Sequence, residues 1–155
     1  MAIAFNMAGG RLSEIFVSEV IFAFGQAATA PYTTPTTEDV SATLSSYFEC
    51  YDAIMMERHG TVTLGQSLDQ AFIRLDALEH TAHICAMAKM MGGARTLPSD
   101  EVDHLYEVAH GDAQPPYRQS NNPCPPLEPG TSEPVATLDE RIVSAVLESL
   151  RRGTG

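Results

Sequence analysis

Residues 53–65 read Ala53-Ile-Met-Met-Glu-Arg-His59-Gly60-Thr-Val-Thr-Leu-Gly65. An apolar run ends in a polar Glu-Arg-His-Gly turn, and a short β-branched run then resumes. Short apolar and β-branched runs on either side of a polar turn are typical of two strands. The pattern therefore predicts strands over 52–56 and 61–64. It places His59 at the end of the first strand, where its side chain can meet a ligand.

A long amphipathic helix is predicted directly after these strands. Ser67 and Gln70 fit a capping box, in which each residue can satisfy a free backbone N–H of the other. Apolar residues then recur at three- and four-residue steps, and Gly92-Gly93 predicts an end near Met91. These apolar residues are Leu68, Phe72, Leu75, Leu78, Ala82 and Cys85. A helix of roughly 24 residues is about 36 Å long, which suggests packing against a neighbouring subunit.

Caps and chain breaks predict the rest of the first 110 residues. The apolar run 15–24 predicts either a short buried helix or a strand, because hydrophobic periodicity cannot distinguish the two in a run of this length. Residues 28–37 form an extended segment and a turn, after which Thr36 or Thr37 caps a helix that reaches about residue 49. Ser99 caps a further helix that ends near Gly111.

The charge balance limits the classes of partner. The 155 residues contain 20 Asp and Glu against 9 Lys and Arg, a formal net charge of −11. Nucleic-acid binding relies on basic surfaces that neutralise phosphates, and anionic membranes attract the same surfaces. No stretch approaches the roughly 20 apolar residues that a membrane span requires. We therefore expect neither a nucleic-acid nor a membrane partner.

The cysteines favour a reducing compartment. Cys50, Cys85 and Cys124 are odd in number and show no metal-type spacing. This pattern fits the cytoplasm better than a disulfide scaffold. Cys85, on the apolar face of its helix, is expected to be inert, and Cys124 is expected to be exposed in a linker.

The C-terminal quarter changes composition. Residues 111–136 contain seven of the ten prolines, which predicts a disordered linker. Residues 137–153 then begin with a capping box, Thr137 to Glu140, and carry an apolar stripe typical of an amphipathic helix. The stripe consists of Ile142, Val143, Val146, Leu147 and Leu150. This helix either packs on its own domain or oligomer, or binds a partner's groove. In the second case it resembles the encapsulation peptides that target enzymes to bacterial microcompartment shells.

Residues 2 to 110 resemble the class II aldolase and adducin family of the fuculose-phosphate aldolase type. The resemblance rests on His59-Gly60, on Leu64-Gly65 and on the helix segment 68–79, Leu-Asp-Gln-Ala-Phe-Ile-Arg-Leu-Asp-Ala-Leu-Glu. The upstream segment 30–38, Ala-Pro-Tyr-Thr-Thr-Pro-Thr-Thr-Glu, stands in the family's order and spacing. So do Gly92-Gly93 and the segment 97–101, Leu-Pro-Ser-Asp-Glu, downstream.

This resemblance implies a three-layer α/β/α fold around a mostly antiparallel sheet, of which the chain would hold the C-terminal portion. It implies a homo-oligomer, usually a tetramer. It also implies aldol cleavage of a sugar phosphate or related hydroxy-carbonyl substrate with a divalent metal, commonly Zn²⁺. In that family three histidines hold the metal, and His59 occupies the position of the third. Zinc suits such a site because neutral imidazole is a good ligand and an open position can take substrate oxygens.

The chain departs from this pattern at the other ligands. The family's His-x-His pair, its acid/base glutamate and its phosphate loops would all precede residue 1. His80 and His83 are spaced by three on a helix, and a solvated helix face explains them, as it does His104 and His110. We therefore expect a metal-dependent aldolase-type lyase that is incomplete in this chain and has His59 as its one metal ligand.

The alternative is a non-catalytic interaction module. In this interpretation the chain is a microcompartment cargo, and residues 137–152 bind a shell protein. The expected location is then the interior of the microcompartment rather than the open cytoplasm.

Overall fold

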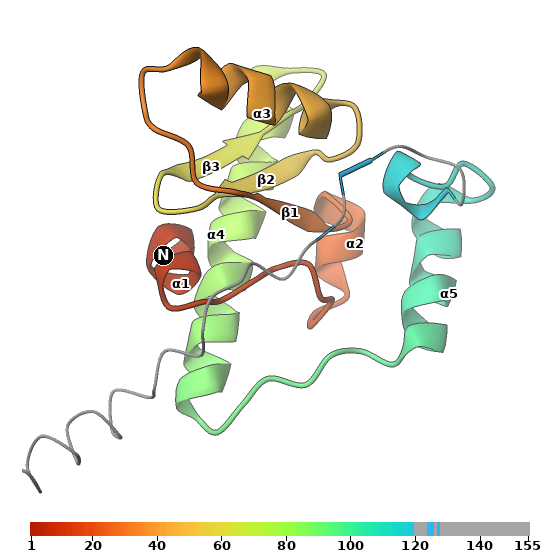
Figure 1. Cartoon of the computed structure of the whole chain (residues 1–155). Coiled ribbons are helices and arrows are strands. Elements are labelled where there is room, and N and C mark those ends of the chain that lie inside the picture. Colours follow the sequence, from red (N-terminus) through yellow and green to blue (C-terminus); the bar gives the residue numbers. More distant parts are fainter. Residues whose placement is uncertain (120–123, 126, 128–155) are drawn as a thin grey trace, which may run out of the picture.

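The structure is a computed structural model that describes residues 1–119, 124, 125 and 127 (Figure 1). The helices are α1 (Ala2–Met7), α2 (Glu19–Ala23), α3 (Glu38–Phe48), α4 (Leu68–Met90), α5 (Ser99–His110) and the 3-10 turn η1 (Pro116–Arg118). The strands are β1 (Ala27–Ala30), β2 (Ala53–Met56) and β3 (Gly60–Thr63). These bounds confirm the predicted α/β class and the two strands around His59.

The three strands of the described region form one mixed sheet in the order β1-β2-β3. β1 pairs with β2 in parallel, with Ala27 opposite Ala53, and β2 pairs with β3 antiparallel, with Met56 opposite Gly60. The expectation of a mostly antiparallel sheet is therefore not met in the part of the chain that the structure describes. The reason lies in α3, because a helix between two strands is the usual crossover that makes them parallel.

Helices cover both faces of the sheet, so the sheet forms a layer between two layers of helices. α3 lies over one face, while α1 and α4 lie over the other (Figure 1). Successive strand residues alternate between the two cores, as the pleat requires. Ala27 and Ala53 pack into the core beside α4, and Ala28 and Ile54 pack into the core beside α3.

Helix α4 agrees with the prediction in its length but only in part of its apolar stripe. The Ser67 hydroxyl accepts a hydrogen bond from the backbone N–H of Gln70 at 3.2 Å, as a cap should. Leu78, Ala82 and Cys85 are buried, whereas Leu68 and Phe72, both predicted to face the core, are 86% and 66% exposed. The first turns of α4 contact β3 instead near Ala71, whose carbonyl accepts a hydrogen bond from the Thr63 hydroxyl at 2.9 Å.

Two of the three cysteines contradict the sequence-based expectation. Cys50 and Cys124 form a disulfide across 74 positions, and Cys85 is free and buried. No local sequence pattern predicts this pairing, because Cys50 and Cys124 are far apart in the sequence and only the tertiary fold brings them together. Cys124 is therefore attached to the domain rather than free in a linker.

The described residues between 111 and 127 lie against the domain. Tyr117 packs against both hydrophobic cores, and the Tyr51 hydroxyl donates to the Pro125 carbonyl at 2.6 Å. The helix expected over 137–153, including the segment 137–152 expected to bind a shell protein, lies outside the described residues. Within the described part, none of the helices combines the length and apolarity needed to cross a membrane.

Candidate functional site

His59 lies in the turn between β2 and β3, and its side chain is exposed. The turn consists of Glu57, Arg58 and His59, and it is closed by a 3.1 Å hydrogen bond from the His59 N–H to the Met56 carbonyl. Arg58 has a φ of 57°, in the left-handed region. Such a residue is common in short hairpin loops that reverse the chain within three residues. The hairpin therefore presents the imidazole at its tip.

The parallel pairing of β1 and β2 brings a second segment to the same edge of the sheet. Ala30 lies opposite Met56, and the Glu57 N–H donates to the Ala30 carbonyl at 3.1 Å. The chain leaving β1 thus begins beside the turn that carries His59, and its Tyr32 is 53% exposed. Ligands in open α/β sheets bind outside the carboxyl ends of parallel strands. We call this place, with Pro31, Tyr32 and residues 57–59, the His59 edge.

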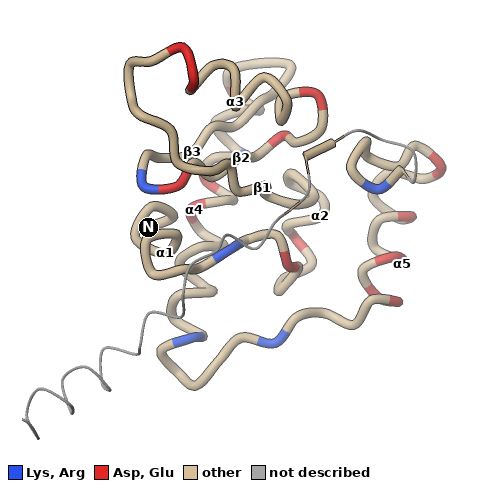
Figure 2. Tube along the Cα trace, viewed as in Figure 1, with Lys and Arg blue, Asp and Glu red and all other residues tan. Residues whose placement is uncertain are grey.

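Helix α1 and the loop after it support the turn. The Arg11 guanidinium pairs with the Glu57 carboxylate at 2.9 Å. The Asn6 side-chain oxygen accepts from the Arg58 N–H at 3.4 Å. Figure 2 shows acidic and basic residues side by side in the hairpin between β2 and β3. No sequence pattern predicted the support from Asn6 and Arg11, although a lone Asn within an apolar segment was a usable signal.

The described residues do not by themselves fit a metal centre. A catalytic zinc site uses three protein ligands, and no group of three His, Cys, Asp or Glu side chains lies within metal-binding reach in the described part. His80, His83 and His104 are exposed on α4 and α5. The structure therefore offers one accessible imidazole at the His59 edge, and further donors would have to come from elsewhere.

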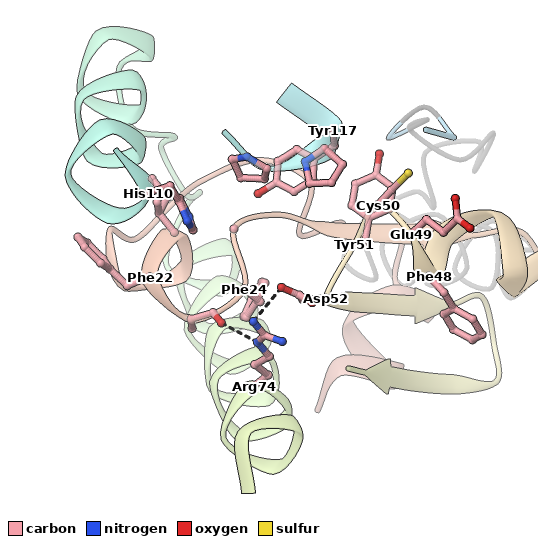
Figure 3. Close-up of a pocket in the computed structure, with 15 residues that line it drawn as sticks. Phe22, Phe24, Phe48, Glu49, Cys50, Tyr51, Asp52, Arg74, His110 and Tyr117 are labelled. Atoms are coloured by element: carbon pink, nitrogen blue, oxygen red, sulfur yellow. Dashed lines mark hydrogen bonds and ion pairs between the residues drawn. The ribbon is translucent and has the colours of Figure 1, made fainter. Parts of the chain in front are cut away.

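A cavity of about 170 Å³ lies at the opposite end of the parallel strands (Figure 3). It is lined by residues that precede the strands, including Gly25 before β1 and Asp52 before β2, together with the end of α5 and η1. Each strand has four residues, which separates its two ends by roughly 10 to 13 Å. The cavity is therefore distinct from the His59 edge.

Two charged side chains of this cavity, Arg74 and Asp52, are engaged in structural contacts. The Arg74 guanidinium donates to the Ala23 carbonyl at 3.2 Å and pairs with Asp52 at 2.8 Å (Figure 3). It also donates to the Leu64 carbonyl at 2.6 Å. Burial raises the pKa of the Tyr117 hydroxyl far above its usual range, so this group stays protonated. Nε2 of His110 is buried and has no hydrogen-bond partner among the described residues. The arrangement holds α2, α4 and the sheet together.

Comparison with known proteins gives a family match and several fold matches. The sequence profile of the Class II Aldolase and Adducin N-terminal domain matches residues 1–86. The YgbL protein of Escherichia coli, provisionally described as an aldolase, epimerase or decarboxylase, is 24% identical with a TM-score of 0.61. That match covers 68% of this chain and 52% of YgbL. No curated protein matches the sequence significantly.

Two further solved structures share the fold. YgbL of Klebsiella pneumoniae, with the same provisional description, is 27% identical with a TM-score of 0.57, over 61% of this chain and 45% of that protein. An L-fuculose 1-phosphate aldolase is 24% identical with a TM-score of 0.59, over 69% of this chain and 50% of the enzyme. The chain thus spans about half the length of these three structures.

Proposed function

The chain belongs to the class II aldolase and adducin family, and from this premise we propose that it forms part of a metal-dependent aldolase-type lyase. The proposed substrate is a sugar phosphate or a related hydroxy-carbonyl compound. The divalent metal, Zn²⁺ in this proposal, would polarise the substrate carbonyl as a Lewis acid when bound. Residues 1–110 would form a portion of the catalytic domain, and the family match lies within them, over residues 1–86.

The observation that supports this proposal is the position of His59. Its imidazole is exposed at the tip of a short hairpin, beside the carboxyl ends of two parallel strands. Neutral imidazole is a good zinc ligand, and a fixed backbone orients it. Arg11 and Asn6 hold the hairpin from the side of α1. In the proposal, His59 supplies one ligand, and the other donors come from outside the described residues.

A zinc titration tests the ligand role of His59 separately from catalysis. The imidazole nitrogens of the full chain are followed by NMR as Zn²⁺ is added. We expect the His59 signals to shift first, and His59→Ala to abolish that first response. His83→Ala removes an exposed histidine from α4 and is the matched control, which should leave the response intact. If zinc shifts another histidine first, the assignment of His59 as a ligand is wrong.

An assay of aldol cleavage tests the reaction. The full chain is supplied with Zn²⁺ and with L-fuculose 1-phosphate as the representative sugar phosphate. The proposal expects cleavage that is lost in His59→Ala and retained in His83→Ala. Cleavage that survives His59→Ala would reject the role of His59 in the proposed reaction, and no cleavage by the zinc-supplied chain would show that these 155 residues do not form a lyase by themselves.

A second candidate function is assembly with another copy of the chain, in keeping with the oligomer that the resemblance implies. It is favoured by the apolar surface on the first turns of α4, where Leu68, Phe72 and Ile73 are 86%, 66% and 64% exposed. Contiguous exposed apolar residues commonly mark interaction sites. Phe72→Asp should shift the chain to a smaller species in sedimentation velocity, whereas the control Asp76→Ala should not. A wild-type chain that sediments as a monomer would reject this candidate.

A further inference from the structure

We propose that Cys50 and Cys124 form a thiol–disulfide exchange site that fastens Cys124, Pro125 and Leu127 to the domain and releases them on reduction. The two cysteines are joined across 74 positions. Cys50 follows Glu49, the C-cap residue of α3, and is 9% exposed, whereas Cys124 is half-buried. We call Cys124, Pro125 and Leu127 the distal strap, and residues 115–119 the proximal strap.

The distal strap has few noncovalent contacts with the domain. The hydroxyl of Tyr51 donates to the Pro125 carbonyl at 2.6 Å. Cys124 and Leu127 pack at the margin of the core that contains Tyr47 and Ile54, and both remain partly exposed. One hydrogen bond between neutral groups contributes about 1 kcal/mol in the general case. The disulfide is therefore the main attachment of the distal strap.

The proximal strap, by contrast, is held without the disulfide. The ring of Tyr117 stacks on Tyr51 with centroids 5.3 Å apart, and its hydroxyl lies 3.0 Å from that of Tyr106. Arg118 covers the Tyr106 ring at 4.1 Å and pairs with Asp103. Tyr117 also packs against both cores. Reduction should consequently free the distal strap and leave the proximal strap in place.

The exchange reaction balances with a small monothiol as reductant. Its thiolate attacks Sγ of Cys124, which belongs to the more exposed of the two cysteines, to form a mixed disulfide, and the Cys50 thiolate leaves and takes up a proton. A second monothiol attacks the mixed disulfide, which releases the Cys124 thiol and a small disulfide. Two electrons pass from the two monothiols to the protein. The reverse reaction, with the small disulfide as oxidant, forms the Cys50–Cys124 disulfide again.

Limited proteolysis of the full chain with chymotrypsin tests whether the disulfide holds the distal strap on the domain. Cleavage after Leu127 reports on the distal strap, and cleavage after Tyr117 reports on the proximal strap. Reduction under native conditions should accelerate cleavage after Leu127 by about tenfold or more, since proteolysis follows local opening, and should leave the rate after Tyr117 unchanged. Cys124→Ser should be cleaved at the reduced rate with and without reductant. Cys85→Ser removes the free thiol and should respond as the wild type does.

Two results would overturn the proposal, and neither depends on the folding of a variant. One is an equal rate of cleavage after Leu127 in the oxidised and reduced wild-type chain. The other comes from counting thiols by alkylation in denaturant without reductant. The air-oxidised chain should expose only the thiol of Cys85, and three alkylated cysteines would show that the disulfide does not form.

Discussion

Gly25→Ala should be among the most destabilising single methyl additions in this chain. Gly25 is buried and has a φ of 76°, which side chains other than glycine adopt at a penalty of about 1 to 2 kcal/mol. An added Cβ would lie 1.8 Å from the Tyr117 hydroxyl oxygen, so the tyrosine ring must move. Its hydroxyl would then lose the 3.0 Å contact with Tyr106. A buried hydroxyl left unpaired adds about 1 to 3 kcal/mol. Together these effects predict a loss of roughly 2 to 5 kcal/mol.

Urea denaturation followed by far-ultraviolet circular dichroism measures this loss, with the disulfide kept intact. Tyr117→Phe removes the clashing oxygen, so the penalty of Gly25→Ala should fall by about 1 kcal/mol or more in that background. Gly111→Ala shows the backbone cost alone, because nothing lies within 4 Å of a Cβ added at Gly111, which has a φ of 58° and a ψ of −136°. A penalty of Gly25→Ala that is unaffected by Tyr117→Phe would refute this reasoning.

Three further predictions concern a thiol, the tyrosines and a helix cap. Burial raises the pKa of Cys85, so under native conditions its thiol should react with iodoacetamide far more slowly than after unfolding. Burial also raises the pKa values of Tyr106 and Tyr117. Above about pH 10 the unfolded chain therefore holds fewer protons than the folded chain, and stability should fall as pH rises, less steeply in Tyr117→Phe. Ser67→Ala removes the cap on the Gln70 N–H and should lower the free energy of unfolding by about 1 kcal/mol, measured by urea denaturation.

Local sequence signals predicted most of the elements, because caps and apolar runs act over a few residues. The strands expected over 52–56 and 61–64 are β2 and β3, and Gly92-Gly93 follows the end of α4 as expected. Thr37 is the N-cap residue of α3, one of the two residues expected. For α5, however, Pro98 occupies the N-cap position and Ser99 is the first helical residue.

Contacts between residues far apart in the sequence could not be predicted from local patterns. The parallel pairing of β1 with β2 depends on where α3 returns the chain, and no local pattern encodes it. The disulfide depends on the path of the segment after Gly111, whose prolines predicted a detached linker. The exposure of Phe72 follows from which face of α4 meets β3, whereas periodicity gives only the existence of an apolar face. Asn6 and Arg11 support the His59 turn through residues about 50 positions away.

The local sequence predicted the position of His59 after β2 directly, and the structure indicates why the hairpin can vary independently of the stability of the domain. His59 lies beyond the carboxyl end of β2, while Arg74, Tyr117 and the disulfide act at the amino end of the same strand. Substitutions separated by more than about 7 to 10 Å with no shared partner are usually additive. The amino-end contacts should therefore set the stability of the domain, and the hairpin should set the chemistry of the imidazole. Gly25→Ala should weaken the fold without changing the response of His59 to zinc in the chain that remains folded.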